Sequence, residues 1–262
     1  EGRGIRKRNG RVARENMDDL QQLLVKLLEQ GSWESIPAEK AVNLIPFNLA
    51  PKPGAEPPWR LINNAMELNK WVLGKWKVKY ESLATLAMVA TPGCWALTMD
   101  LKDGYYAMWL EKACRALLAG QLVFEARYAE LLRAAELIGD EVVSLEGGQV
   151  RVTMQPRGLV MGFTNSCAIF TKLTRQVVKH WRKKGVRMVH MMDDFAFFAD
   201  TKEEAVKLRD MVLKDLEELG FYVSWKKSLL EPAQVFKFLG FVVDLRAMRK
   251  YVPGEKIEEV EQ

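Results

Sequence analysis

The sequence is poor in the residue types on which several common kinds of site depend. It has only two histidines, His180 and His190, so a histidine-centred catalytic triad or a histidine-rich metal site is nearly excluded. Its three cysteines are scattered, which fits neither a zinc spacing nor a disulfide framework and favours a reducing compartment. It has no apolar run long enough to span a bilayer and no signal-peptide core. We therefore expect an intracellular protein without membrane contact, in a nucleus, cytoplasm or organelle that the sequence does not distinguish.

The residues that are present indicate a globular chain with basic clusters on its surface. Its 262 residues suffice for one large domain or two lobes, and 48% apolar with 28% charged residues is the globular range. The net charge of +5 is concentrated before residue 15, at 179–187 and at Lys226–Lys227. Such clusters suit a nucleic-acid backbone. For the cluster at 179–184 alone, ordinary solvated surface is the better explanation.

Hydrophobic periodicity predicts the order of the elements. Leucines at helical spacing predict a helix over 17–30, the Pro-rich stretch 45–58 predicts an extended loop, and a helix follows near 81–90. Further along, the pattern predicts a strand over 94–100, helical structure over 107–140, a hairpin over 141–155, a helix over 166–184, strands over 186–192 and 195–199, a helix over 201–219 opened by a Thr201–Glu204 capping box, and strands near 221–224 and 235–243.

This order of strands and helices predicts an α+β fold with a ferredoxin-like split βαβ sheet and helices on one face. In that topology the first and second strands run parallel, and the third lies between them, antiparallel to both. Asp100 ends the first strand, whereas Asp193 and Asp194 join the second strand to the third. We therefore expect these three carboxylates to meet at one edge of the sheet.

The Asp pair in RMVHMMDDFAFFAD, residues 187–200, has two interpretations. Taken alone, the stretch slightly favours an exposed hairpin turn, where Asp is common. The alternative is a divalent metal site, because three converging carboxylates repel one another unless a cation is present. Oxygen ligands suit Mg²⁺. Two such ions about 3.5–4 Å apart would stabilise the attacking and leaving oxygens of a phosphoryl displacement.

Five segments resemble, in order, the fingers and palm of reverse transcriptases. The match covers about residues 42 to 256, and its segments are WRLINNAMELN (59–69), MDLKDGYYAMWL (99–110), VMGFTNSCAIFTKL (160–173), the Asp pair with Met191 where Tyr is usual, and LGFYVSWKKSLLEPAQVFKFLGF (219–241). The last segment, with SCAIFTKLTRQV, is most similar to retrotransposon polymerases of the tyrosine-recombinase class. The departures from the family pattern are Asn64 for Asp, Met66 for Arg, and Val160 and Cys167 for two prolines.

The resemblance implies a role for each matching residue. Two Mg²⁺ ions, with Mn²⁺ as a substitute, would be held by Asp100, the Leu101 carbonyl, Asp193 and Asp194. Lys227 would protonate the leaving pyrophosphate, with Lys226 as second candidate. Nucleotide-binding residues would be Lys52, Arg60, Tyr105, Met161 and Gly162, with Tyr105 excluding a ribose 2′-hydroxyl, and the primer grip would be Phe238, Leu239, Gly240 and Phe241.

The same resemblance divides the chain into segments. These would be a basic arm (1–16), the N-terminal part of the fingers (17–93), the palm strand with the first catalytic Asp (94–112), a helical insertion and hairpin (113–158), the palm with the Asp pair and primer grip (159–244), and the start of a thumb or a C-terminal tail (245–262).

Two functions follow from the resemblance. The first is an RNA-directed DNA polymerase that adds dNTPs to the 3′-hydroxyl of a DNA or RNA primer on an RNA template, with protein partners that supply a thumb or scaffold. The second is a domesticated, inactive reverse-transcriptase-like domain that serves as an RNA-binding or structural subunit of a ribonucleoprotein. The expected lack of a thumb, the helical insertion and the replaced motif residues motivate the second. A nucleotidyl cyclase is disfavoured because its Gly-Gly-acidic hairpin is missing.

Overall fold

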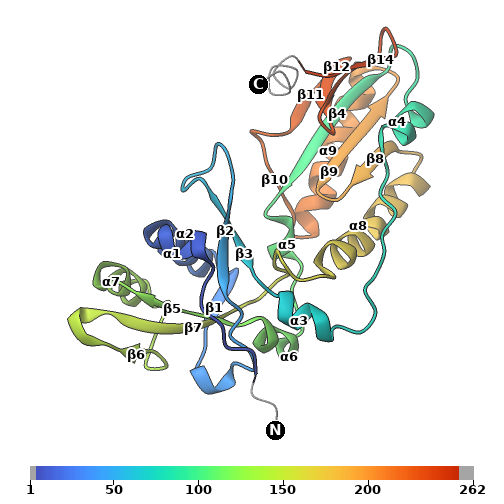
Figure 1. Ribbon diagram of the computed structural model, residues 1–262. Helices are drawn as coiled ribbons and strands as arrows, with labels where there is room; N and C mark the ends of the chain where they lie inside the picture. The colour runs from blue at the N-terminus through green and yellow to red at the C-terminus, as the bar shows by residue number, and fades with distance from the viewer. Residues whose placement is uncertain (1–3, 254–262) are drawn as a thin grey trace. The chain divides into compact units, whose positions relative to one another are not determined.

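The computed structural model describes residues 4–253, and its internal contacts divide the chain into two compact units (Figure 1). Unit 1 consists of Glu1–Trp76 and Tyr105–Ser166, and unit 2 of Lys77–Gly104 and Cys167–Gln262. Each unit is therefore assembled from two separate stretches of chain. The predicted thumb start or tail lies outside the described residues from residue 254 onward.

Unit 1 is built from short helices around a small sheet and a hairpin. Its elements are α1 (Arg11–Glu15), α2 (Met17–Glu29), β1 (Trp33–Ser35), η1 (Ala38–Lys40), β2 (Phe47–Pro51), β3 (Trp59–Asn63), α3 (Met66–Trp71), α6 (Lys112–Arg115), η2 (Ala116–Leu118), β5 (Gly120–Phe124), α7 (Ala126–Ala134), β6 (Val143–Ser144), η3 (Glu146–Gly148) and β7 (Val150–Pro156). The short α5 (Gly104–Ala107) crosses the boundary between the units.

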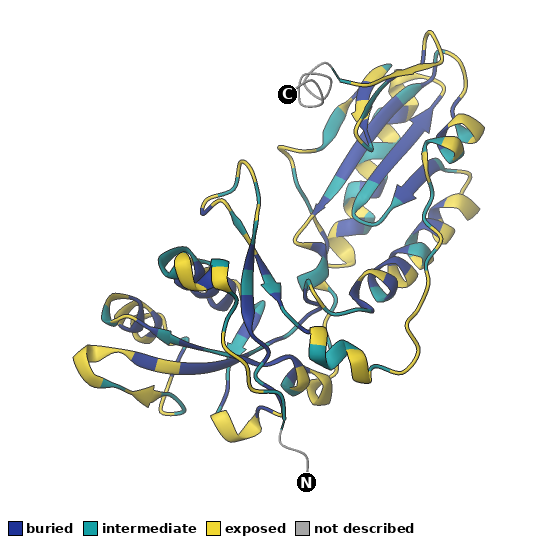
Figure 2. Ribbon diagram, in the orientation of Figure 1, coloured by how far each residue is buried: buried dark blue, intermediate teal, exposed yellow. Residues whose placement is uncertain are grey.

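The sheet of unit 1 has the order β1-β7-β5, with β6 also pairing with β7, while β2 and β3 form a separate antiparallel hairpin. The leucines of α2 are buried against both, as the helical periodicity predicts (Figure 2). The predicted helical stretch over 107–140 is wrong at residues 120–124, which form β5. There Leu122 and Phe124 alternate with less buried residues, the period of a strand. Gly120 permits close packing, because a Cβ there would lie 2.2 Å from the Phe47 ring.

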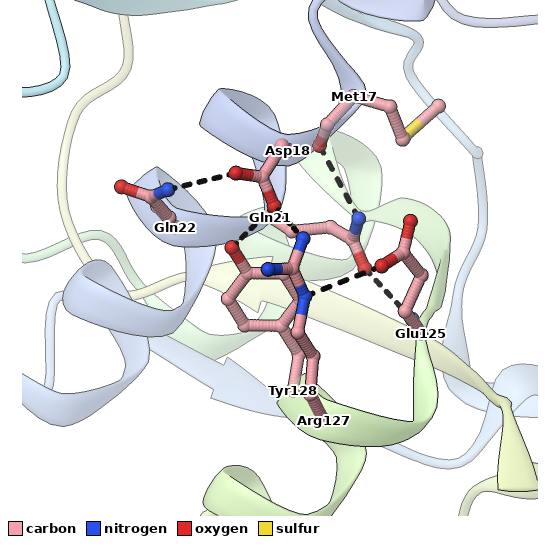
Figure 3. Close-up of polar contacts among 7 residues, drawn as sticks. All are labelled: Met17, Asp18, Gln21, Gln22, Glu125, Arg127 and Tyr128. Atoms are coloured by element: carbon pink, nitrogen blue, oxygen red, sulfur yellow. Dashed lines mark hydrogen bonds and ion pairs between the residues drawn. The ribbon is translucent and has the colours of Figure 1, made fainter.

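A polar cluster ties α2 to α7 (Figure 3). Asp18 accepts hydrogen bonds from the Tyr128 hydroxyl at 2.5 Å and from Gln22 Nε2 at 3.0 Å, and it pairs with Arg127. The hydrogen bond from Tyr128 holds the pKa of Asp18 below its ordinary value. Beside it, the Gln21 side chain accepts the backbone N–H of Glu125 at 2.7 Å. Helix α7 of the predicted insertion is therefore fixed by directional contacts to α2 of the same unit.

Unit 2 contains the larger sheet. Its elements are α4 (Leu83–Val89), β4 (Trp95–Lys102), α8 (Ser166–Lys183, beginning on the last residue of unit 1), β8 (Arg187–Met191), β9 (Asp194–Ala199), α9 (Lys202–Glu218), β10 (Tyr222–Val223), β11 (Leu229–Ala233), β12 (Val235–Phe238), β13 (Phe241–Asp244) and β14 (Arg249–Tyr251). The sheet order is β10-β4-β9-β8, with β11 also pairing with β4, so β9 lies between β4 and β8 and is antiparallel to both. The predicted split βαβ topology is confirmed.

The two faces of this sheet are covered differently. On one face Trp181 of α8 packs edge-on against Phe195 and Phe197 of β9, and its indole N–H donates to Asp215 of α9 at 2.8 Å. The two long helices thus share one face, as predicted, and α9 begins with the expected Thr201–Glu204 capping box. The opposite face packs against α4 and the β12-β13-β14 sheet in a separate core cluster. The central strands are accordingly buried on both sides (Figure 2).

Candidate active site

Three carboxylates come together at one edge of the unit 2 sheet. Asp100 near the end of β4 is the direct cross-strand partner of Asp194, the first residue of β9. Because Met191 pairs with Asp194, the β8–β9 connection is a two-residue turn of Met192 and Asp193. The carboxylate edge, as we call Asp100, Asp193 and Asp194, therefore arises where the split βαβ topology predicts it.

The electrostatics of the carboxylate edge are unfavourable for three negative charges. Burial, together with the charges of Asp193 and Asp100, raises the pKa of Asp194 to about 6, while the charge of Lys227 opposes this rise. The Lys227 Nζ lies 3.7 Å from Asp100 Oδ2, and the Asp100 side chain is only 16% exposed. The three carboxylates thus crowd negative charge at this edge, and oxygen ligands in such surroundings suit a hard divalent cation.

The turn between β10 and β11 clamps the backbone of Asp100. The Asp100 N–H donates to Ser228 Oγ at 3.0 Å, and the Ser224 N–H donates to the Asp100 carbonyl at 2.8 Å. The Leu101 N–H donates to the Asp193 carbonyl at 3.1 Å, which links β4 to the β8–β9 turn. Sequence reasoning missed Ser224 and Ser228; their position on either side of the Trp225-Lys226-Lys227 run was the available signal.

His190 supports the turn that carries Asp193, and sequence reasoning missed this too. Met192 has φ of 59°, a left-handed conformation that is strained for a residue with a side chain. The His190 Nε2 lies 2.7 Å from the Met192 carbonyl oxygen, which can only accept, so Nε2 carries the proton. The ring is 3% exposed and stacks on Phe195, and burial lowers its pKa. A neutral, fixed imidazole therefore holds the strained turn.

A pocket of about 230 Å³ opens beside the carboxylate edge. Its lining comprises Thr98, Met99, Asp100, Asp194, Phe195, Lys227, Lys237, Phe238, Leu239 and Gly240. Three residues of the predicted primer grip thus line the same pocket as two of the aspartates. Phe238 pairs with Phe241 across a two-residue turn in which Leu239 and Gly240 have φ of 47° and 79°. Both angles are positive, as a type I′ hairpin turn requires.

The side chains of the carboxylate edge lie near one another but do not form a metal-binding cluster. Within residues 4–253, no three His, Cys, Asp or Glu side chains are grouped tightly enough to hold a metal ion by themselves. The structure thus brings the predicted ligands Asp100, Asp193 and Asp194 to one edge, next to a lysine, without grouping them into a ligand set. Leu101, whose carbonyl is the fourth predicted ligand, pairs with Val223 of β10.

The predicted nucleotide-binding residues lie in unit 1. Lys52 directly follows β2, and Arg60 is exposed on β3 of the same hairpin. The Met161 carbonyl accepts the Asn63 N–H at 2.9 Å, and Gly162 has φ of 105°. A Cβ on Gly162 would lie 1.9 Å from the Asn63 carbonyl oxygen, so only glycine fits there.

Two further contacts fix these segments. The Asn69 side chain donates to the Gly162 carbonyl at 2.8 Å and accepts the Thr164 N–H at 2.9 Å, so the first and third motif segments are joined within unit 1. Tyr105 also belongs to unit 1, where its carbonyl accepts the Leu159 N–H at 3.1 Å. The predicted metal and primer-grip residues all lie in unit 2, and the predicted nucleotide-binding residues in unit 1.

Comparison with known proteins identifies the family. A family model described as reverse transcriptase (RNA-dependent DNA polymerase) matches residues 51–243, so the chain belongs to this family. The Gag-Pol polyprotein of Avian reticuloendotheliosis virus is 25% identical over 187 residues, which are 71% of this chain and 14% of the polyprotein. The Pol polyprotein of Feline endogenous virus ECE1 is 24% identical over 243 residues, 92% of this chain and 21% of the polyprotein. The chain thus spans a small part of these relatives.

Solved structures agree on the fold. The foamy viral protease-reverse transcriptase in complex with dsDNA matches with a TM-score of 0.73 at 23% identity, covering 100% of this chain and 46% of that one. The same enzyme in complex with an RNA/DNA hybrid matches with a TM-score of 0.67 at 22% identity, covering 100% of this chain and 30% of that one. The α+β fold and the resemblance to reverse transcriptases are confirmed.

Within residues 4–253, no helix combines the length and hydropathy needed to cross a bilayer.

The raised pKa of Asp194 predicts that this residue destabilises the metal-free protein. An acid whose pKa is raised on folding opposes folding once it ionises, so the penalty is absent below pH 4 and complete above pH 6. After a discount for partial solvent exposure, we expect Asp194→Asn to raise the free energy of unfolding by about 1–2 kcal/mol at pH 8. Urea unfolding at pH 8, with a chelator to remove metal ions, measures this free energy. The variant Asp140→Asn, at an exposed position, is the control. Equal stability of wild type and Asp194→Asn at pH 8 would contradict the crowding of the carboxylates.

The bond from His190 to Met192 predicts a requirement for a hydrogen-bond donor at position 190. We expect His190→Leu to lower the free energy of unfolding by about 1 kcal/mol, because the Met192 carbonyl loses its donor. His190→Gln, which can donate from its amide, should recover most of that stability in urea unfolding. An equal loss of stability in both variants would show that the donor at position 190 does not matter.

Proposed function

We propose that this chain is the polymerase core of a reverse transcriptase, which adds dNTPs to a primer 3′-hydroxyl under the direction of an RNA template. The observation that carries the proposal is the carboxylate edge beside the pocket lined by Phe238, Leu239 and Gly240. Family membership supports the same reaction class. The polyprotein relatives contain much more than this chain.

The residues of the carboxylate edge offer the kind of oxygen ligands that two Mg²⁺ ions, or Mn²⁺ in their place, would take. Asp100, Asp193 and Asp194 offer oxygen ligands, the Leu101 carbonyl could add another, and the raised pKa of Asp194 marks an excess of negative charge. When bound, such ions neutralise phosphate oxygens and favour the attacking hydroxyl in its ionised form. The protein positions these ligands through the Ser228 and Ser224 bonds to Asp100 and through the His190-supported turn.

Other residues act on the substrates. Lys227 would give a proton to the leaving pyrophosphate from its place in the pocket, with the exposed Lys226 as second candidate. Phe238 to Phe241 would hold the primer end, since their hairpin turn borders the pocket that Asp100 and Asp194 line.

In unit 1, Arg60 and Lys52 would bind the triphosphate, because a guanidinium and an ammonium both suit phosphate oxygens. Tyr105 would exclude a ribose 2′-hydroxyl. Met161 and Gly162 would lie under the nascent base pair, where the glycine lets the backbone approach closely. These roles follow the family pattern onto matching positions of this chain.

The substrates in this proposal are an RNA template, a DNA or RNA primer, and dNTPs. The titles of the foamy viral structures name dsDNA and an RNA/DNA hybrid as the nucleic acids bound by those enzymes. The placement among retrotransposon polymerases of the tyrosine-recombinase class rests on the segment 219–241 and stays a prediction.

A second candidate function is an inactive, RNA-binding or structural subunit of a ribonucleoprotein. Two observations favour it: Lys227 pairs with Asp100, and residues 4–253 contain no preassembled group of metal-ligating side chains. A lysine that neutralises a catalytic carboxylate could stand in for the cation in a scaffold. Against it, Asp100, Asp193 and Asp194 lie at one edge of the sheet, which supports the polymerase proposal.

Primer extension on an RNA template decides between the two functions. We expect the wild-type chain to extend an annealed primer with dNTPs and Mg²⁺ or Mn²⁺, and Asp193→Asn to lose at least about 10³-fold in rate, because a metal ligand acts on the transition state. The exposed Asp140→Asn is the matched control and should keep the wild-type rate. A folded wild-type chain that binds the RNA duplex but extends nothing with either metal would contradict the polymerase and favour the subunit.

A further inference from the structure

Unit 1 contains a second pocket, of about 330 Å³, that holds none of the residues assigned above to catalysis or nucleotide binding. We call it the N-terminal pocket. It is lined by Lys7, Arg8, Asn9, Arg14, Met17, Leu44, Ile45, Gln121, Leu122 and Val123. These residues come from the first segment of the chain, from α1 and α2, from the stretch before β2, and from β5, which all belong to unit 1 (Figure 1).

The basic wall of this pocket is held in place by backbone contacts. The Ile5 N–H donates to Asn43 Oδ1 at 3.0 Å, and the Leu44 N–H donates to the Ile5 carbonyl at 2.7 Å. Further along, the Gly10 N–H donates to the Phe47 carbonyl at 2.8 Å. Residues 5–10 therefore lie fixed along residues 43–47, and the cations that they carry are presented by an ordered backbone.

The charge of the N-terminal pocket is not balanced. Its lining has three cations and no acidic residue. Lys7 pairs with Glu67 at 2.9 Å, whereas the guanidinium groups of Arg8 and Arg14 make no hydrogen bond or ion pair with any residue that the structure describes. Two guanidinium groups are thus available to an anion, and their planar fork of donors matches phosphate oxygens.

The floor of the pocket is apolar, which favours an occupant larger than a simple inorganic anion. Ile45 and Leu122 are buried, and Leu44, Val123 and Met17 are half-buried beside them. A lone phosphate would satisfy the arginines and leave the exposed parts of Leu44, Val123 and Met17 in contact with water. A nucleotide matches both parts, because its base is flat and weakly hydrated while its phosphates are anionic.

We propose that the N-terminal pocket binds one unpaired nucleotide of a single-stranded RNA, with the base against the apolar floor and the flanking phosphates on Arg8 and Arg14. This site rests on the proposed function in one respect, which is that the RNA it binds would be the template. Its residues are separate from the carboxylate edge. It gives unit 1 a hold on the RNA strand that does not depend on a bound dNTP or on base pairing.

Binding of a fluorescein-labelled single-stranded RNA to the full chain, followed by anisotropy at several salt concentrations, tests the site. We expect the double variant Arg8→Gln/Arg14→Gln to bind about tenfold more weakly than wild type. The slope of log K against log salt should fall by about 1.4, because about 0.7 is lost for each phosphate contact on a single strand. The matched control is Arg151→Gln/Arg249→Gln, which removes the same charge from exposed positions and should stay within about twofold of wild type.

A second strand separates a nucleotide site from a phosphate site. An RNA of the same length with abasic residues should bind wild type about tenfold more weakly, and the double variant should bind both strands alike. Equal wild-type affinity for the two strands would overturn the nucleotide assignment. Equal losses in the Arg8/Arg14 variant and the Arg151/Arg249 control would overturn the pocket itself, since general charge would then explain the binding.

The outcome can be told apart from that of the polymerase proposal. Asp193→Asn should bind single-stranded RNA like wild type, because its change lies in unit 2. Pocket-dependent binding by a chain that never extends a primer would contradict the polymerase and leave this inference standing. Primer extension by wild type, together with unchanged RNA binding in the Arg8→Gln/Arg14→Gln variant, would support the polymerase and contradict the nucleotide site in the N-terminal pocket.

Discussion

The mutual repulsion of three carboxylates at one edge of a sheet is the constraint on which the site of this protein depends. Asp100 and Asp194 face each other across β4 and β9, and Asp193 occupies the adjoining turn. Burial and the neighbouring charges raise the pKa of Asp194 to about 6, so the arrangement is held together against its own electrostatics. An ordinary surface turn would let such side chains swing apart into water. Here the backbone of each aspartate is tied down.

The ties come from residues with no part in the chemistry. Ser228 and Ser224 take up the N–H and carbonyl of Asp100, and Leu101 donates to the Asp193 carbonyl. His190 secures the carbonyl of Met192, which sits in a left-handed conformation at the turn. A strained, hydrogen-bonded turn between buried strands is a rigid place to mount a ligand. Repulsion and backbone strain thus occur at the same place in the fold. A bound cation would relieve the repulsion, and the His190 hydrogen bond offsets the strain.

The sequence predicted the sheet of unit 2 because its strands and helices differ clearly in period, and because a helix between strands forces them parallel. It predicted the carboxylate edge for the same reason, since topology alone carries Asp100 to the Asp pair. The prediction from sequence was wrong at β5. There Leu122 and Phe124 alternate with less buried residues, but the segment lies among Ala- and Leu-rich residues that favour a helix. The sequence pattern did not lead to His190 or Ser228, because their hydrogen bonds reach backbone atoms, and for Ser228 the only signal was its place beside the Trp225-Lys226-Lys227 run. The N-terminal pocket could not be predicted from the sequence, because the residues that line it are far apart in the chain and come together only in the folded protein.

Binding of a divalent cation at the carboxylate edge is the central claim, and a Mn²⁺ titration of the metal-free chain, read by electron paramagnetic resonance of the free ion, tests it most directly. The account predicts that wild type binds Mn²⁺ at pH 7.5, that Mg²⁺ competes for the same site, and that Asp100→Asn abolishes the binding while the exposed Asp140→Asn does not. Binding should weaken below pH 6, where Asp194 takes up a proton. Wild-type protein that binds no Mn²⁺, or an Asp100→Asn variant that binds it equally well, would contradict the account.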